Sequence, residues 1–166
     1  MNNLTTLLLI LFSIMGYSQQ ITAVQLKNGG VFLEVENEFR FDKNTKGIVF
    51  RDLDLYIGPQ SKKTLMNGLK KVSEWMVLNG REQMSFKKEV VRFTAMSKSE
   101  YKNFGYVPQL AKEIRLIFIG KQDGTSAVQL EAGISKLTID NIDDVEGFIN
   151  ILSGKSGTPD IDRIFN

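Results

Sequence analysis

Two carboxylates on one predicted strand come closest to a catalytic arrangement. Asp52 and Asp54 occupy alternate positions of the run 50–56, so both side chains project from the same face, about 7 Å apart. That spacing fits the carboxyl pair of a glycoside hydrolase, and it also fits two oxygen ligands of a divalent metal ion. A solvated strand face is the simpler interpretation, because two neighbouring ionised carboxylates lack the raised pKa that a general acid needs.

Aromatic side chains form the second candidate site. Tyr101, Phe104 and Tyr106 lie within six positions of one another, in a segment (97–110) that also contains Gly105 and Pro108 and that we predict to be a loop. Aromatic rings on a loop above a rigid scaffold provide stacking surfaces for sugars or peptides. The alternative is a lid whose rings fill the open end of the core. If the chain binds a ligand, these three residues are the predicted binding site.

The composition excludes several classes of chemistry. The chain has 166 residues, a net charge of +2, no histidine and no cysteine. Ser-His-Asp and Cys-His catalysis, imidazole bases and thiolate zinc sites are therefore excluded. The lysine pairs 62/63, 70/71 and 87/88 are interpreted as solvated surface, with weak attraction to a lipid or lipopolysaccharide headgroup as the alternative, because nucleic-acid-binding domains are usually far more basic. We expect no cofactor and no nucleic-acid partner.

The first 18 residues are predicted to be a secretory signal peptide. They contain no charged side chain, they carry an apolar run over 4–15, and Gly16 and Ser18 place small residues before a cut at Gln19. The apolar run is shorter than the roughly 20 residues of a membrane-spanning helix, so we expect no stable span after cleavage. Cleavage would leave one α+β domain over 19–153 and a tail over 154–166. An exported chain without cysteine indicates a bacterial envelope, either periplasmic or secreted.

Alternating patterns and turn signals predict an antiparallel sheet. Residues 19–26 and 31–37 are predicted strands joined by a type I′ turn, in which Asn28 and Gly29 would both have positive φ. The segment 39–46 is a predicted loop. Further strands are predicted over 47–57, 84–96, 113–120, 127–132 and 136–140. Hairpin turns replace strand–helix alternation, so the sheet is expected to be antiparallel, with about six or seven strands.

Two helices complete the expected α+β fold. The segment 61–78 is a predicted long amphipathic helix that begins at an N-cap Ser61 and ends at Asn79-Gly80. Its apolar stripe, predicted to pack on one face of the sheet, consists of Leu65, Leu69, Val72 and Met76. A short C-terminal helix is predicted over 143–152, opened by a capping box of Asp143 and Glu146.

Three functional hypotheses follow from these patterns. The leading one is a small, exported, non-enzymatic module that binds an envelope protein or a small ligand through Tyr101, Phe104 and Tyr106. The second is a carboxylate hydrolase or a divalent-metal protein that uses Asp52 and Asp54. The third is a carrier that holds an apolar ligand between a curved sheet and the long helix. No sequence motif decides among them.

Overall fold

The computed structural model describes residues 20–36, 40–42, 47–49, 53–133 and 135–155. Seven strands form one antiparallel sheet in the order β1-β2-β5-β6-β7-β8-β9, and β3 (Arg40–Asp42) and β4 (Gly47–Val49) pair in a separate two-stranded sheet. The sheet strands are β1 (Gln20–Gln25), β2 (Val31–Glu36), β5 (Leu53–Ile57), β6 (Phe86–Ser97), β7 (Lys112–Gly120), β8 (Ser126–Ala132) and β9 (Ser135–Ile139). The predicted antiparallel α+β fold is confirmed.

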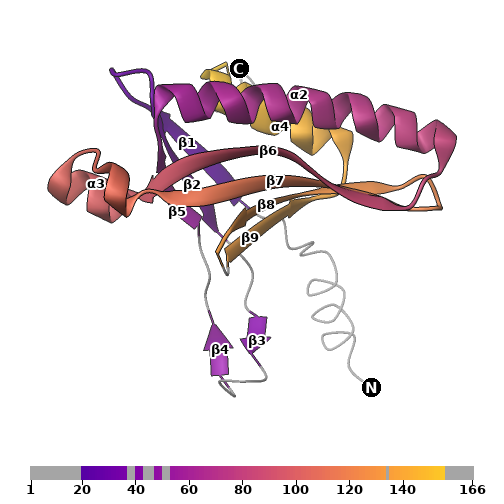
Figure 1. Cartoon of the computed structure of the whole chain (residues 1–166), viewed down its shortest axis with the longest axis horizontal. Helices are drawn as coiled ribbons and strands as arrows, with labels where there is room; N and C mark the ends of the chain where they lie inside the picture. The colour runs from indigo at the N-terminus through magenta and orange to yellow at the C-terminus, as the bar shows by residue number, and fades with distance from the viewer. Residues whose placement is uncertain (1–19, 37–39, 43–46, 50–52, 134, 156–166) are drawn as a thin grey trace, which may run out of the picture.

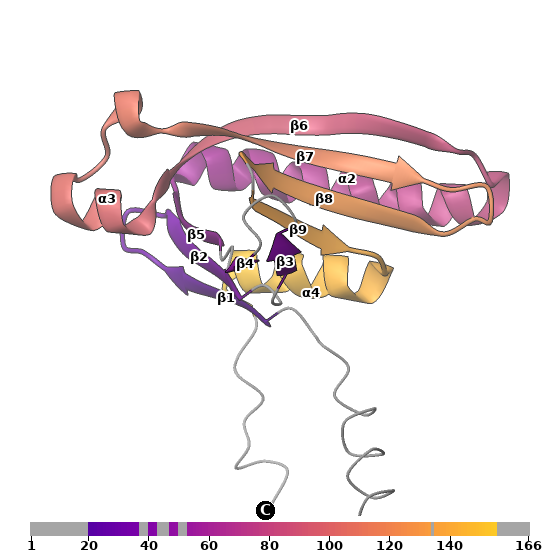
Figure 2. The ribbon, with the colours of Figure 1, turned by 90° about the horizontal axis from the view of Figure 1, so that it is seen from below.

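Two helices cover one face of this sheet. The long α2 (Pro59–Glu82) lies beside the C-terminal α4 (Ile142–Ser153), and the short α3 (Lys98–Phe104) projects at one end of the sheet (Figures 1 and 2). The predicted stripe of α2 is buried. It packs in one core with the inward residues of the strands, among them Leu33, Ile57, Ile114, Leu116 and Phe118. The helical period therefore predicted the core face of α2 correctly.

A glycine sets how closely α2 approaches the sheet. A Cβ atom at Gly68 would lie 2.5 Å from Cγ2 of Val91 on β6 and 3.0 Å from Cδ2 of Leu116 on β7. No side chain fits in that space, so the helix backbone packs directly against these two strands. Trp75 lies at the flank of the same interface, with its ring 5.5 Å from that of Phe118.

Both ends of α2 differ from the prediction. The helix begins at Pro59 after the N-cap Gly58, so Ser61 lies inside the first turn. Proline suits this position because the first helical N–H has no partner within the helix. At the other end the helix continues past Asn79-Gly80 to Glu82, and Gln83 ends it with a φ of 52°.

Asn79 explains why the helix continues. Its side chain is buried and bonds to backbone groups beyond the helix. Nδ2 donates to the carbonyl oxygens of Lys121 (3.2 Å) and Thr125 (3.0 Å), and Oδ1 accepts from the N–H of Met84 (3.0 Å). Two of these bonds connect the end of α2 to the β7–β8 turn, and the third holds the segment that follows the helix. A residue type common at helix ends therefore serves here as a tertiary contact.

The turn between β1 and β2 is a second correction. Gly29 has a φ of 83°, but Asn28 does not have a positive φ, so the turn is not type I′. The Gly29 N–H donates to the Leu26 carbonyl at 2.9 Å, and the Asn28 side chain accepts from the Gly30 N–H at 3.0 Å. The bond from Gly29 to Leu26 makes Lys27 and Asn28 the central residues of the turn, and the left-handed Gly29 follows them.

Three segment predictions are also corrected. The predicted loop 39–46 contains β3 (Arg40–Asp42), and the predicted strand 47–57 divides into β4 (Gly47–Val49) and β5. The predicted loop 97–110 contains α3 and a 3₁₀ turn, Pro108–Leu110.

The start of α4 is one more difference. The N-cap of α4 is Asn141, whose side chain accepts from the Asp144 N–H at 2.8 Å, and not Asp143. Asp143 and Asp144 instead occupy the first turn, where the positive end of the helix dipole favours a carboxylate.

Candidate functional site

The candidate site lies where α3 meets the outer face of β2 and β5. The end of β6 pairs with β5 through Leu55↔Ser97 and Tyr56↔Met96, and α3 follows at once. Phe32 and Tyr56 are direct cross-strand partners. Because Leu33 and Leu55 are buried toward the helices, these two aromatic side chains project from the opposite face, beside α3.

Tyr101 anchors α3 to this face. Its ring is stacked on that of Tyr56, with centroids 3.6 Å apart and planes 13° apart, and meets Phe32 edge-on at 5.7 Å. Asn28 donates from Nδ2 to both hydroxyl oxygens, at 3.2 Å to Tyr56 and 3.1 Å to Tyr101. Tyr56 is buried, and this burial, followed by the hydrogen bond with Tyr101, raises the pKa of its hydroxyl. The rings of Tyr56 and Tyr101 therefore hold α3 against the sheet.

Phe104 and Tyr106 are the exposed members of the group. Their relative exposures are 67% and 51%, and the Tyr106 ring centroid lies 6.2 Å from that of Tyr56. Gly105, with a φ of 69°, ends α3 between them and redirects the chain. We call Phe32, Tyr56, Tyr101, Phe104 and Tyr106 the aromatic surface. The structure thus divides the predicted trio into one anchor and two exposed rings.

Charged groups border the aromatic surface. The ammonium groups of Lys98 and Lys102 lie 5.6 Å and 5.8 Å from the centre of the Phe32 ring. Lys98 also forms an ion pair with Glu34 and lies 3.9 Å from Asp54. Cations over an aromatic face are attracted by its quadrupole. The surface therefore combines apolar stacking area with two lysines and two carboxylates at its edge.

Sequence reasoning missed Phe32 and Tyr56. Both lie on predicted strands, and alternation alone places each on the face opposite its buried neighbours. Their pairing depends on the β2–β5 register, which spans the β3–β4 insertion. No short-range signal reveals that register, so the anchor for Tyr101 could not be found from the sequence.

Of the two carboxylates in the hydrolase and metal hypotheses, the structure describes only Asp54. Asp54 lies exposed on β5, opposite Glu34 across the strand pair, and Asp52 falls outside the described residues. Partial burial raises the pKa of Asp54, and the charge of Lys102 opposes that shift. The described part of the chain contains no group of three or more acidic side chains placed to hold a metal ion. The hydrolase and metal hypotheses stay predictions without further support.

The carrier hypothesis receives no support from the helix–sheet interface. Leu69 and Val72 of α2 and Leu116 and Phe118 of β7 are almost completely inaccessible to solvent and belong to one core. These side chains occupy the space in which an apolar ligand was expected.

Comparisons of the chain with family models, curated proteins and solved structures gave no match. None of the helices in the described ranges is both long and apolar enough to cross a membrane. The function is therefore argued from the geometry of the aromatic surface.

Proposed function

We propose that this chain is an exported, non-enzymatic module of a bacterial cell envelope that binds an envelope protein or a small ligand through the aromatic surface. The observation that carries the proposal is the exposure of Phe104 and Tyr106 on a segment that the Tyr101–Tyr56 stack holds in place. Exposed aromatic side chains supply much of the binding energy at protein interfaces. A rigid support lowers the entropy lost on binding.

The surroundings of the two rings agree with recognition. Tyr106 keeps a hydroxyl that can donate or accept a hydrogen bond, and Lys102 adds a cation to the aromatic surface, 5.8 Å from the centre of the Phe32 ring. A module of this kind needs no imidazole base or thiolate nucleophile, and the chain contains neither histidine nor cysteine. The predicted leader supports an envelope location.

Photo-crosslinking from one position tests the proposal. A benzophenone amino acid would replace Phe104 in bacteria that express the whole chain, and irradiation would be followed by analysis of adducts. Leu78 is the matched control, because it is an apolar residue of similar exposure on α2 (50%), outside the aromatic surface. We expect a discrete adduct from position 104 that is absent from position 78.

Two results would contradict the proposal. One is the same set of adducts from both positions, which would indicate unspecific collisions. The other is an adduct at position 104 that persists unchanged when Tyr106 is replaced by serine and Lys102 by glutamine.

A further inference from the structure

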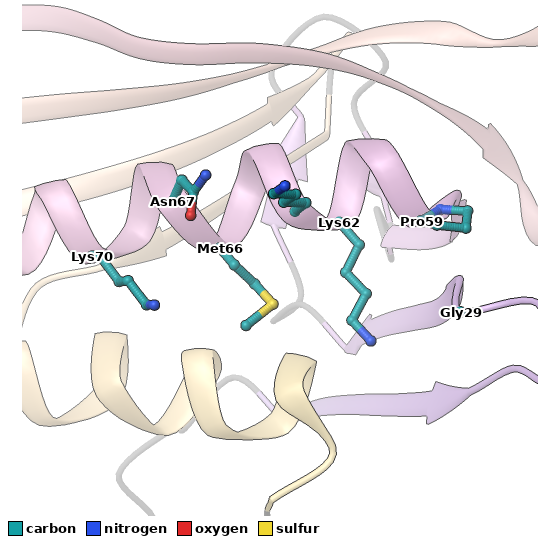
Figure 3. A pocket seen from close by; sticks show the side chains of 7 residues that line it. Gly29, Pro59, Lys62, Met66, Asn67 and Lys70 are labelled. Carbon is teal, nitrogen blue, oxygen red and sulfur yellow. The ribbon is translucent and has the colours of Figure 1, made fainter.

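A pocket lined by lysines lies on α2, where the helix faces the turn between β1 and β2. Its volume is about 230 Å³, and it is lined by Gly29, Pro59, Lys62, Lys63, Met66, Asn67 and Lys70. Lys62, Met66 and Lys70 follow one another at four-residue intervals, and Figure 3 shows their side chains projecting from the same side of α2. The aromatic surface contributes no residue to this pocket.

The charge of the pocket is not neutralised by its own residues. Three of the seven lining residues are lysines and none is acidic. Within the described residues, none of these three ammonium groups forms an ion pair. Lys62 donates to the side-chain oxygen of Gln25 at 2.5 Å, and this amide is a neutral partner. By contrast, Lys87, Lys98 and Lys136 on the sheet and α3 all have carboxylate partners.

The remaining lining residues suit a small ligand. Pro59 and Met66 provide an apolar wall, and a thioether side chain adapts its shape to what it contacts. Gly29 adopts a φ of 83° and leaves the space beside Pro59 open, since a Cβ there would lie 3.7 Å from that ring. Asn67 adds an amide that can donate or accept. Pockets for drug-sized ligands start at about 300 Å³, so this one suits a headgroup or a similar small molecule.

We propose that this pocket binds the phosphate group of a small phosphomonoester. Lysine ammonium groups bind phosphate as point charges, and a phosphomonoester carries close to two negative charges at neutral pH. A single carboxylate offers only one charge to three cations. The same phosphate chemistry could come from a soluble metabolite or from a lipid headgroup, and the experiment separates these two sources. This proposal is independent of the proposed function.

Two binding measurements on the purified chain test the pocket. In the first, glycerol 3-phosphate is titrated and the amide resonances of Gly29, Met66 and Asn67 are followed by NMR, with glycerol as the neutral control. In the second, co-sedimentation is measured with vesicles of phosphatidic acid in phosphatidylcholine, and with phosphatidylcholine alone. Shifts with glycerol 3-phosphate support a soluble source, and binding to phosphatidic acid vesicles alone supports a headgroup.

A charge-matched pair of variants separates a site from diffuse attraction. The Lys63→Gln/Lys70→Gln chain loses two lysines of the pocket, and the Lys112→Gln/Lys121→Gln chain loses two exposed lysines elsewhere. We expect the first to weaken binding at least about tenfold, because charged hydrogen bonds are lost, and the second to change it less than about twofold. Circular dichroism would show that both variants fold. Equal weakening in both, or no binding of either probe, would overturn the proposal.

Discussion

Tyr101 and Phe104 lie three residues apart on the same short helix and have different surroundings. Tyr101 is stacked on Tyr56 and bonded by Asn28, whereas 67% of Phe104 is exposed. Residue type and spacing identified both as candidates, since aromatic residues around Gly105 are unusual in a solvated segment. Which ring anchors α3 and which ring is exposed depends on the strand face behind them, to which β2 contributes Phe32 and β5 contributes Tyr56. The sequence alone could therefore identify these residues as candidates, but it could not predict which of them anchors α3 and which is exposed.

This division predicts that two alanine substitutions differ in their effect on stability. Tyr101→Ala should lower the free energy of unfolding by about 2 kcal/mol, because a half-buried stacked ring and its hydrogen bond are lost. Phe104→Ala should change it by less than about 0.5 kcal/mol while removing contacts available to a partner. Urea denaturation of both variants checks this, and a larger loss for Phe104→Ala would show that the roles are reversed.

A second prediction at this scale concerns Asn79. Asn79→Ala should lower the free energy of unfolding by about 2–3 kcal/mol, because it removes three hydrogen bonds of a buried side chain, to the carbonyl oxygens of Lys121 and Thr125 and to the Met84 N–H. Asn67→Ala, at an exposed position of the same helix, is the control and should cost less than about 0.5 kcal/mol. Similar denaturation midpoints for the two variants would mean that the tertiary hydrogen bonds of Asn79 do not stabilise the fold.

At the scale of elements, periodic patterns were more informative than end signals. The apolar stripe of α2 follows from the helical period. The strands from β6 to β9 were each placed within about two residues of their observed bounds. The helix ends were wrong because Ser61, Asn79 and Asp143 are residue types that favour caps without requiring them. Their actual roles depend on neighbours that are distant in the sequence, as with the bonds from Asn79 to Lys121 and Thr125.

Two glycines of α2 give a matched prediction at this scale. Gly68→Ala should lower the free energy of unfolding by about 1–2 kcal/mol, because the clash with Val91 exceeds the gain in helix propensity. Gly80→Ala should raise it by about 0.5–1 kcal/mol, because a Cβ there meets nothing within 4 Å. Thermal unfolding of both variants and of Gly68→Ala/Val91→Ala checks this. The added Val91→Ala change should partly restore stability if the clash is the cause.

At the scale of the whole molecule, the order of the strands in the sheet could not be predicted from the sequence patterns. Hairpin signals predicted the neighbours β1–β2 and β7–β8, both of which pair. The β5–β6 pair is joined across the 24 residues of α2, and only two residue pairs connect these strands. Two strands joined by so long a segment have no turn motif between them that would predict their pairing. The position of α3 beside β2 follows from this pairing, so it could not be predicted either.

The predicted leader gives a prediction for the chain in the cell. Expressed in full in a bacterium, the chain should be recovered from the periplasm or the medium with Gln19 as its first residue, because Gly16 and Ser18 fit the cleavage position. Replacing Leu8 and Leu9 with arginine should hold it in the cytoplasm at its original mass, since the apolar run is interrupted. N-terminal sequencing and fractionation provide the measurement, and recovery of an uncut chain from the soluble cytoplasm would contradict export.

The last helix closes the core against the first strand. The Gln25 side chain on β1 donates to the carbonyl oxygens of Ile151 and Leu152 at the end of α4, a separation of more than 120 residues. Val145, Phe148 and Leu152 are almost inaccessible to solvent in the shared core. Burial of each contributes about 1.5–3 kcal/mol. Together these contributions are comparable with the 5–15 kcal/mol stability of an ordinary domain, so the fold is expected to depend on its final element.

Removal of α4 tests this dependence. A chain ended after Asp140 should lose cooperative urea unfolding, because the apolar faces of β1 and α2 would meet water. Phe148→Ala should keep a cooperative transition but lose about 3–5 kcal/mol. Glu146→Ala, at an exposed position of the same helix, should change stability by less than about 0.5 kcal/mol. If the shortened chain unfolds at the same urea midpoint as the full chain, α4 is not needed for a stable core. The contact between β1 and α4 would then contribute nothing to the free energy of unfolding.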